Sequence, residues 1–338
     1  MISILFSLFL FILSVAVIMI GSDWITDSSI HLARRLGTSN LAFGLVIISV
    51  LLSLPEVIIA VSAILKGHPS LGFGSAIGSV IVNIGLIVGV SALIRPLKVP
   101  RIMVTRDMIY MTVVSIVVVA MALEDRFLSR TEGFVFFILF IPYVINVYEQ
   151  ERNLTQQEKE QKAEKMAETL ERYGDIRAHH MPQYGLPHFV GGFILLLIGA
   201  EIFIRVLLDL TLSLGMPELL IGITLGALGP SIPNLAAALG AARKGVEELV
   251  ISETIGANIF TLLITIGIIA MLSPLPIDEV TALITAPSLL AITFILLFAM
   301  LNGKVTRTHA ILLLLVYVGT IMAEFMFRQN GIPNLIGL

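Results

Sequence analysis

Glu56 is the residue of this sequence with the clearest chemical capacity, because it is a carboxylate in a stretch apolar enough to lie in a lipid bilayer. An acid at membrane depth is costly and therefore predicts a functional site. Pro55 precedes it, and Ser53 and Ser49 share its helical face. Proline frees a backbone carbonyl in a helix. A broken helix with an acid beside the break predicts a cation site.

Three further polar stripes follow helical spacing. They consist of Ser75, Ser79 and Asn83; of Thr224, Ser231 and Asn234; and of Glu253 and Thr261, with Asn258 on a neighbouring face. Their carboxylate, amide and hydroxyl oxygens suit Ca²⁺, Mg²⁺ or Na⁺. We expect Glu56, Glu253 and Asn234 to be the main metal ligands, assisted by freed carbonyls.

A different explanation competes for some of these residues. Each Ser or Thr taken alone is equally typical of close helix packing in membranes. Glu253 follows Glu247 and Glu248, so it is also consistent with a polar helix entry. Packing gives no reason to bury Glu56.

The stretch around Glu56 recurs in the second half of the chain at a constant offset and without a gap. The residues shared by the two copies are mostly those that set backbone geometry. They pair as Gly21 with Gly199, Gly37 with Gly215, Gly44 with Gly222, Ser53 with Ser231, Pro55 with Pro233, Gly67 with Gly245, Gly78 with Gly256 and Pro96 with Pro274. We therefore expect an internal structural repeat.

The composition is that of a multi-pass membrane protein, with 57% hydrophobic and 13% charged residues. Windows of about 20 apolar residues predict ten transmembrane helices in an all-α fold. They cover approximately 3–20, 40–65, 71–93, 103–123, 133–148, 189–210, 219–242, 249–272, 280–301 and 309–327. The second and seventh are expected to break at Pro55 and Pro233. We divide the chain into a five-helix repeat (1–148), a hydrophilic loop (149–187) and a second five-helix repeat (188–338).

The basic residues predict the orientation. Of the 21 Lys and Arg residues, 16 fall on the side of the 149–187 loop, which is therefore expected to be cytoplasmic, with both termini outside. A repeat of five helices enters the membrane in the opposite sense the second time. Inverted repeats with paired broken helices are typical of secondary transporters. We expect location in the plasma membrane of a prokaryote.

The motifs resemble those of the cation/Ca²⁺ exchanger superfamily, which includes the Na⁺/Ca²⁺ exchangers. Its repeat reads roughly Gly-Thr-Ser-x-Pro-Glu, followed in the next span by Gly-Asn-x-x-Gly-Ser-Asn. The corresponding residues here are Ser53-Leu54-Pro55-Glu56 and Gly74-Ser75-Ala76-Ile77-Gly78-Ser79, then Ser231-Ile232-Pro233-Asn234 and Ser252-Glu253-Thr254-Ile255-Gly256-Ala257-Asn258. The resemblance implies antiport by alternating access, in which the first and sixth helices slide across a core that holds the ions.

The sequence departs from that pattern at the candidate ion ligands. The second Pro-Glu step is Pro233-Asn234, the Thr before each Ser is Leu52 or Pro230, and Thr261 stands where Na⁺/Ca²⁺ exchangers often carry an acid. Glu253 stands where the motif has Asn. Two acids balance one divalent or two monovalent ions.

We expect exchange of Ca²⁺ for Na⁺, with H⁺-coupled Ca²⁺ or Mg²⁺ exchange as the alternative. A transport-inactive or channel-like protein of the same fold is the alternative from another class. No catalytic constellation, nucleotide-binding motif, nucleic-acid-binding feature or cofactor motif is evident, and cysteine is absent. We expect Asp107, Asp278, Glu279 and Glu324 to be interfacial. The sequence leaves the counter-ion, stoichiometry and oligomeric state open.

Overall fold

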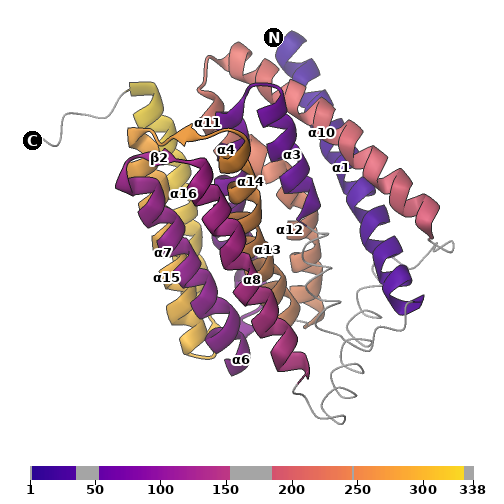
Figure 1. Cartoon of the computed structure of the whole chain (residues 1–338), viewed down its shortest axis with the longest axis vertical. Coiled ribbons are helices and arrows are strands. Elements are labelled where there is room, and N and C mark those ends of the chain that lie inside the picture. Colours follow the sequence, from indigo (N-terminus) through magenta and orange to yellow (C-terminus); the bar gives the residue numbers. More distant parts are fainter. Residues whose placement is uncertain (1, 36–52, 153–184, 246, 331–338) are drawn as a thin grey trace, which may run out of the picture.

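The computed structural model describes residues 2–35, 53–152, 185–245 and 247–330, and these form a helical bundle with two small strand pairs (Figure 1). Eight helices of this part are long and apolar enough to cross a membrane. Of the other two expected spans, α3 is a 12-residue apolar helix whose preceding residues lie outside the described part. The other, α10, is a continuous helix of 29 residues.

The first half begins with one long helix and continues as shorter segments joined end to end. Its elements are α1 (Ile2–Arg35), α3 (Leu54–Leu65), α4 (Pro69–Ile81), η1 (Val82–Val88), α5 (Gly89–Ile94), β1 (Leu97–Lys98), α6 (Arg101–Met103), η2 (Val104–Met108), α7 (Ile109–Glu124), β2 (Phe127–Leu128) and α8 (Arg130–Arg152). Here α denotes an α-helix and η a π-helical turn.

The second half contains α10 (Leu186–Leu214), α11 (Glu218–Ile221), η3 (Gly222–Gly226), α12 (Ala227–Lys244), α13 (Glu247–Phe260), η4 (Thr261–Thr265), α14 (Ile266–Leu272), β3 (Leu275–Pro276), η5 (Thr281–Thr285), α15 (Ala286–Leu301), β4 (Lys304–Val305) and α16 (Arg307–Asn330). From α13 onward, the second half follows the order that the first half has from α4 onward, except that no short α-helix precedes η5 among the described residues.

Several backbone features recur at the repeat spacing. η4 begins at Thr261, which is the repeat equivalent of Asn83 in η1. η5 begins at Thr281, directly before the equivalent of Val104, where η2 begins. Gly67 and Gly245 both adopt positive φ, at 84° and 77°. Wide π-helical turns like η1, η2, η4 and η5 are frequent at functional sites.

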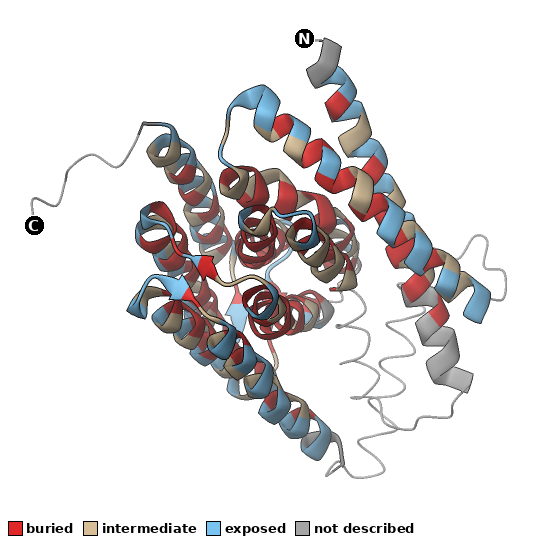
Figure 2. Cartoon of the chain, turned by 45° about the horizontal axis from the view of Figure 1, so that its top comes forward, coloured by how far each residue is buried: buried red, intermediate tan, exposed pale blue. Residues whose placement is uncertain are grey.

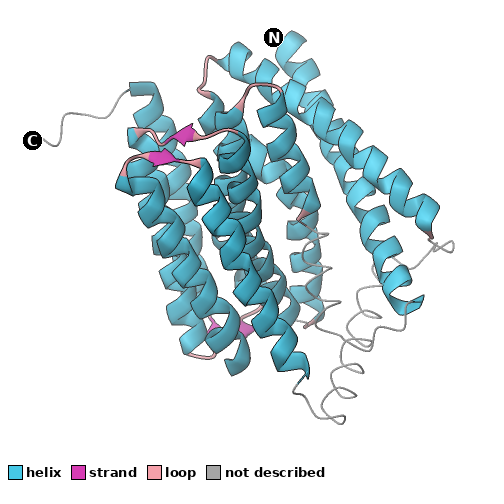
Figure 3. Ribbon diagram, viewed as in Figure 1, coloured by secondary structure: helices cyan, strands magenta, loops and turns pink. Residues whose placement is uncertain are grey.

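The strands join the two halves at opposite ends of the bundle. β1 pairs with β4 at one end, and β2 pairs with β3 at the other, both antiparallel (Figure 3). Each strand of the first half thus pairs with a strand of the second half.

Helices α1 and α10 lie side by side at the edge of the bundle (Figure 1). They approach closely because glycines face each other: a Cβ on Gly192 would lie 2.8 Å from the carbonyl oxygen of Gly21, and one on Gly199 would meet Ile18. Small residues let membrane helices pack with their backbones close together. The two helices therefore form one tightly packed pair.

Buried residues concentrate in the central helices (Figure 2). The main apolar cluster joins α4, α7, α8 and α13 to α16. A second, smaller cluster joins α1 and α10 to α3, α4 and α11 through residues such as Ile18, Ile59, Leu71 and Phe203. The α1–α10 pair thus packs on the bundle through an apolar cluster that is separate from the main one.

Of the four acids expected to be interfacial, Asp107 and Glu324 are buried within the protein, at 3% and 0% exposure. Each is paired with an arginine: Asp107 with Arg106 at 2.6 Å and Glu324 with Arg328 at 2.5 Å. Asp278 and Glu279 are exposed, as expected for interfacial residues.

Candidate functional site

Glu56 lies in the first turn of α3 and is almost fully buried, at 2% exposure. Pro55 also lies in this first turn, where its missing N–H costs nothing. The helix therefore begins at the Leu-Pro step. Ser53 immediately precedes it and is buried. Ser49 lies outside the described residues.

Asn234 of α12 contacts Glu56 directly. Its Nδ2 donates to Glu56 Oε1 over 3.4 Å, and both side chains are buried. The two residues are related by the same sequence offset as Pro55 and Pro233. Within the described part, Glu56 Oε2 has no hydrogen-bond partner. The carboxylate therefore keeps one oxygen for a ligand.

The seventh span is not broken at Pro233, contrary to the sequence-based expectation: α12 continues through both Pro230 and Pro233. Pro230 cannot donate a hydrogen bond to the carbonyl of Gly226, and the hydroxyl of Ser75 in α4 donates to that oxygen instead, over 2.8 Å. A neighbouring span thus supplies the missing hydrogen bond, which is how prolines are tolerated inside membrane helices.

A small cavity lies beside the Glu56–Asn234 contact. Its lining residues are Asn83, Ile87, Asn234, Ala238, Val250, Glu253, Thr254 and Ala257. Glu253 is half-buried and lines the cavity together with Asn83 and Asn234. The fold therefore brings Glu56, Asn83, Asn234 and Glu253 together from four different spans.

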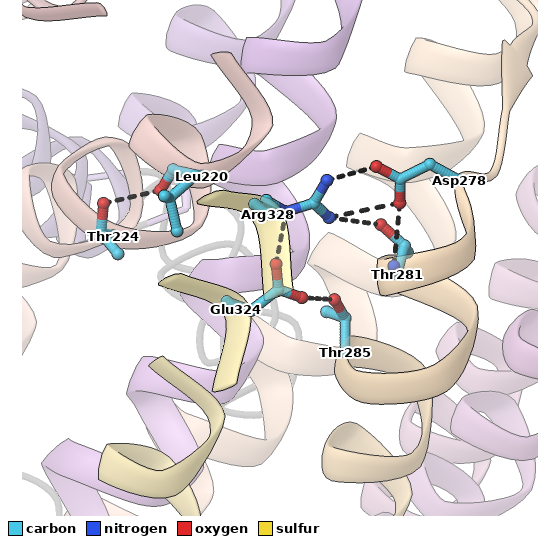
Figure 4. Close-up of polar contacts among 7 residues, drawn as sticks. All are labelled: Leu220, Thr224, Asp278, Thr281, Thr285, Glu324 and Arg328. Atoms are coloured by element: carbon cyan, nitrogen blue, oxygen red, sulfur yellow. Dashed lines mark hydrogen bonds and ion pairs between the residues drawn. The ribbon is translucent and has the colours of Figure 1, made fainter. Parts of the chain in front are cut away.

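The other candidate ligands are buried but do not line this cavity in the described part of the chain. Ser53, Ser79, Ser231 and Thr261 are all at most 1% exposed. Thr224, which shares the Ser231 stripe, instead donates its hydroxyl to the Leu220 carbonyl at 2.6 Å (Figure 4).

Sequence reasoning missed Asn258 as a site residue. Its Oδ1 accepts a hydrogen bond of 3.0 Å from Asn83 Nδ2, between α13 and η1. The spacing from Glu253 placed Asn258 on a neighbouring helix face. That face proves to be the one turned toward η1, which periodicity within one helix does not reveal.

The acids of the site are few. Among the described residues, no three His, Asp or Glu side chains lie close enough to hold a metal ion together. A cation in the cavity would therefore meet at most two carboxylates, with neutral amide, hydroxyl and carbonyl oxygens completing its coordination.

A second polar cluster lies at one end of α16, apart from the cavity (Figure 4). Arg328 is hydrogen-bonded to Asp278 and, at 3.0 Å, to Thr281, and it bonds Glu324 at 2.5 Å. Glu324 also accepts a hydrogen bond from Thr285. This cluster joins α16 to η5 and to Asp278 just before it.

The model of the family described as sodium/calcium exchanger protein matches residues 6–148 and 184–326, which is most of both halves. The chain belongs to the sodium/calcium exchanger family. This confirms the resemblance inferred from the two motif pairs and identifies a multi-pass membrane protein of a transporter family.

Two relatives and a solved structure are similar to this chain over most of its length. Inner membrane protein YrbG of Escherichia coli is 31% identical over 80% of this chain and 81% of its own. Sodium/calcium exchanger MaX1 of Methanosarcina acetivorans is 29% identical over 90% and 94%. The solved structure of the sodium-calcium exchanger NCX_Mj soaked with Na⁺ and Sr²⁺ matches with a TM-score of 0.66 and 26% identity, over 94% of this chain and 98% of that one.

Proposed function

We propose that this exchanger-family protein is a secondary active antiporter that exchanges Ca²⁺ for Na⁺ by alternating access. The observation that carries the proposal is the contact of Glu56 with Asn234, its repeat equivalent, beside a cavity that Glu253 also lines. Membrane-buried acids are rarely kept without an ion to balance them.

Glu56 is the primary cation ligand in this proposal, and Glu253 supplies the second negative charge. The amide oxygens of Asn83 and Asn234 add neutral ligands. The hydroxyls of Ser49, Ser53, Ser79, Ser231 and Thr261 are the further candidate ligands, although the last four are buried outside the lining of the cavity in this structure. Two carboxylates balance one Ca²⁺, or two Na⁺, in turn. Exchange follows because both kinds of ion use the same charges.

The two halves act as inverted five-helix repeats, 1–148 and 188–338, joined by the cytoplasmic 149–187 loop, with ten spans in all and both termini outside. Strand pairing at opposite ends of the bundle supports this arrangement, as does the recurrence of π-helical turns at equivalent positions of the two halves. Inverted repeats place the ion site near the membrane midplane.

The tightly packed α1–α10 pair is the moving part in the proposed cycle. Facing glycines hold the two helices together, while a separate contact layer joins them to the core. A rigid pair that slides over this layer opens the cavity to one side at a time, whereas a channel would need a continuous path.

H⁺-coupled exchange of Ca²⁺ or Mg²⁺ is the second candidate. Asn234 and Thr261 stand where the family pattern and its Na⁺/Ca²⁺ exchangers carry acids, which leaves fewer charges for Na⁺. A carboxylate that releases its cation in a buried site is a natural proton acceptor.

Ca²⁺ uptake into proteoliposomes separates these candidates. Uptake is measured with an outward Na⁺ gradient, then with a proton gradient and no Na⁺, and finally with Mg²⁺ in place of Ca²⁺. Glu56→Gln keeps the size of the side chain and removes its charge, so it is expected to abolish uptake. Substantial uptake by this variant would exclude Glu56 as the ligand. No uptake of either ion by the unmodified protein would favour a transport-inactive or channel-like protein.

A further inference from the structure

Asn83 and Asn258 meet side chain to side chain in the interior of the bundle. Asn83 Nδ2 donates to Asn258 Oδ1 over 3.0 Å, and the residues are 2% and 0% exposed. Within the described part of the chain, Asn83 Oδ1 and Asn258 Nδ2 have no hydrogen-bond partner. One hydrogen bond therefore satisfies half of each carboxamide.

The surroundings of the two asparagines differ. Asn83 lines the cavity together with Asn234 and Glu253, whereas Asn258 is not among its lining residues. With its nitrogen held by Asn258, the polar atom that Asn83 keeps for a ligand is an oxygen. A carboxamide in the flipped orientation would offer an NH₂ group, which donates hydrogen bonds and cannot coordinate a cation.

We infer that Asn258 is a positioning residue of the cation site: it holds the Asn83 carboxamide in the orientation that makes Oδ1 available to a divalent cation. Groups that orient a metal ligand from outside the coordination shell change metal affinity by about 10- to 100-fold when removed. The inference rests on the proposed function, because it requires a cation in the cavity.

The residue types of the Asn83–Asn258 pair are not repeated in the other half of the sequence. The positions equivalent to Asn83 and Asn258 in the other half hold Thr261 and Val80. Valine has no acceptor, so it cannot orient its neighbour as Asn258 does. Asn258 thus makes the two halves of the site chemically unequal.

The test is Ca²⁺ uptake kinetics in proteoliposomes for Asn258→Leu, which keeps roughly the same size and removes the acceptor. We expect KM for Ca²⁺ to rise about tenfold, while the maximal rate stays within about twofold of the unmodified protein. Thr265→Val is the matched control, since Thr265 is buried on the same span, has an unpartnered hydroxyl among the described residues and does not line the cavity. It should leave KM unchanged.

A double-mutant cycle distinguishes orientation from simple structural support. Asn83→Asp presents a carboxylate oxygen whichever way it is turned, so it does not need to be oriented. In that background the effect of Asn258→Leu on KM should fall from about tenfold to less than about twofold. An equal effect in both backgrounds, or an unchanged KM for Asn258→Leu alone, would overturn the positioning role. Failure of the unmodified protein to take up any ion would instead overturn the proposed function.

Discussion

Lys66 and Glu201 form an ion pair of 2.8 Å between the turn after α3 and the middle of α10. Glu201 is also bonded by Arg205, at 2.7 Å along the same helix. Lys66–Glu201 therefore ties the α1–α10 pair to the core. Sliding of α10 would have to break or re-form it.

We expect Lys66→Met to change the exchange rate by at most about fivefold, because a partly exposed ion pair is worth up to about 1 kcal/mol. Arg205→Met is the control, since it removes the second partner of Glu201 and leaves the link to the core.

The chain has no cysteine, so a single cysteine introduced in place of Ala238, which lines the cavity, would report how accessible the cavity is to thiol reagents. Identical labelling in all variants would show that the Lys66–Glu201 ion pair does not influence how often the cavity is open to the reagent.

Asn234→Glu is expected to change the ion preference. The new carboxylate would replace an amide that contacts Glu56 at 3.4 Å, and two neighbouring like charges are stabilised by a cation between them. Thermal stability should therefore depend more strongly on added Ca²⁺ than in the unmodified protein, while Asn234→Gln should show no such gain. An unchanged ion profile in uptake assays would place Asn234 outside the site.

Gly192→Ala is expected to destabilise the protein by about 1–3 kcal/mol, because the added Cβ would lie 2.8 Å from the Gly21 carbonyl oxygen and from the Trp24 side chain. Gly319→Ala on α16 is the control, since no heavy atom lies within 4 Å of the added methyl group. Thermal unfolding in detergent checks both. Equal melting temperatures would mean that α1 and α10 separate easily.

Arg328→Met should destabilise the protein by about 3–5 kcal/mol, because it leaves the fully buried Glu324 without its charged partner. Adding Glu324→Gln should recover much of the loss, since the orphaned charge is then gone. Arg205→Met, whose side chain is 72% exposed, should change stability by less than about 0.5 kcal/mol. A failure of the second substitution to rescue would exclude an orphaned charge as the cause.

Asp278 gives this cluster a pH dependence. Burial raises the pKa of this carboxyl, but hydrogen bonds from Arg328 and Thr281 more than offset that effect, so the pKa lies below its usual value. The folded pKa is thus depressed, and the stabilisation is complete above the unfolded pKa of about 3.9. It is lost as pH falls through the folded pKa. Unfolding measured from pH 6 downward should show a steeper loss of stability for the unmodified protein than for Asp278→Asn.

The amino-acid sequence by itself determined the membrane class, the family and the ungapped internal repeat, because apolar runs and backbone-shaping residues act locally. Glu56 was also recognisable, since an acid in an apolar stretch needs a reason. Its burial at the start of α3 agrees with that reasoning.

Only the tertiary structure decided which helix faces meet. The Asn83–Asn258 bond, the Ser75 hydroxyl on the Gly226 carbonyl and the hydrogen bond from Thr285 to Glu324 all join residues of separate elements. Helical periodicity places residues on one face of one helix, but it does not set the rotation of that helix against its neighbours. Periodicity also fails to show what a neighbouring helix supplies. Pro233 predicted a break in α12, yet the helix continues through both of its prolines. At the nearby Pro230, the Ser75 hydroxyl of another helix replaces the missing hydrogen bond.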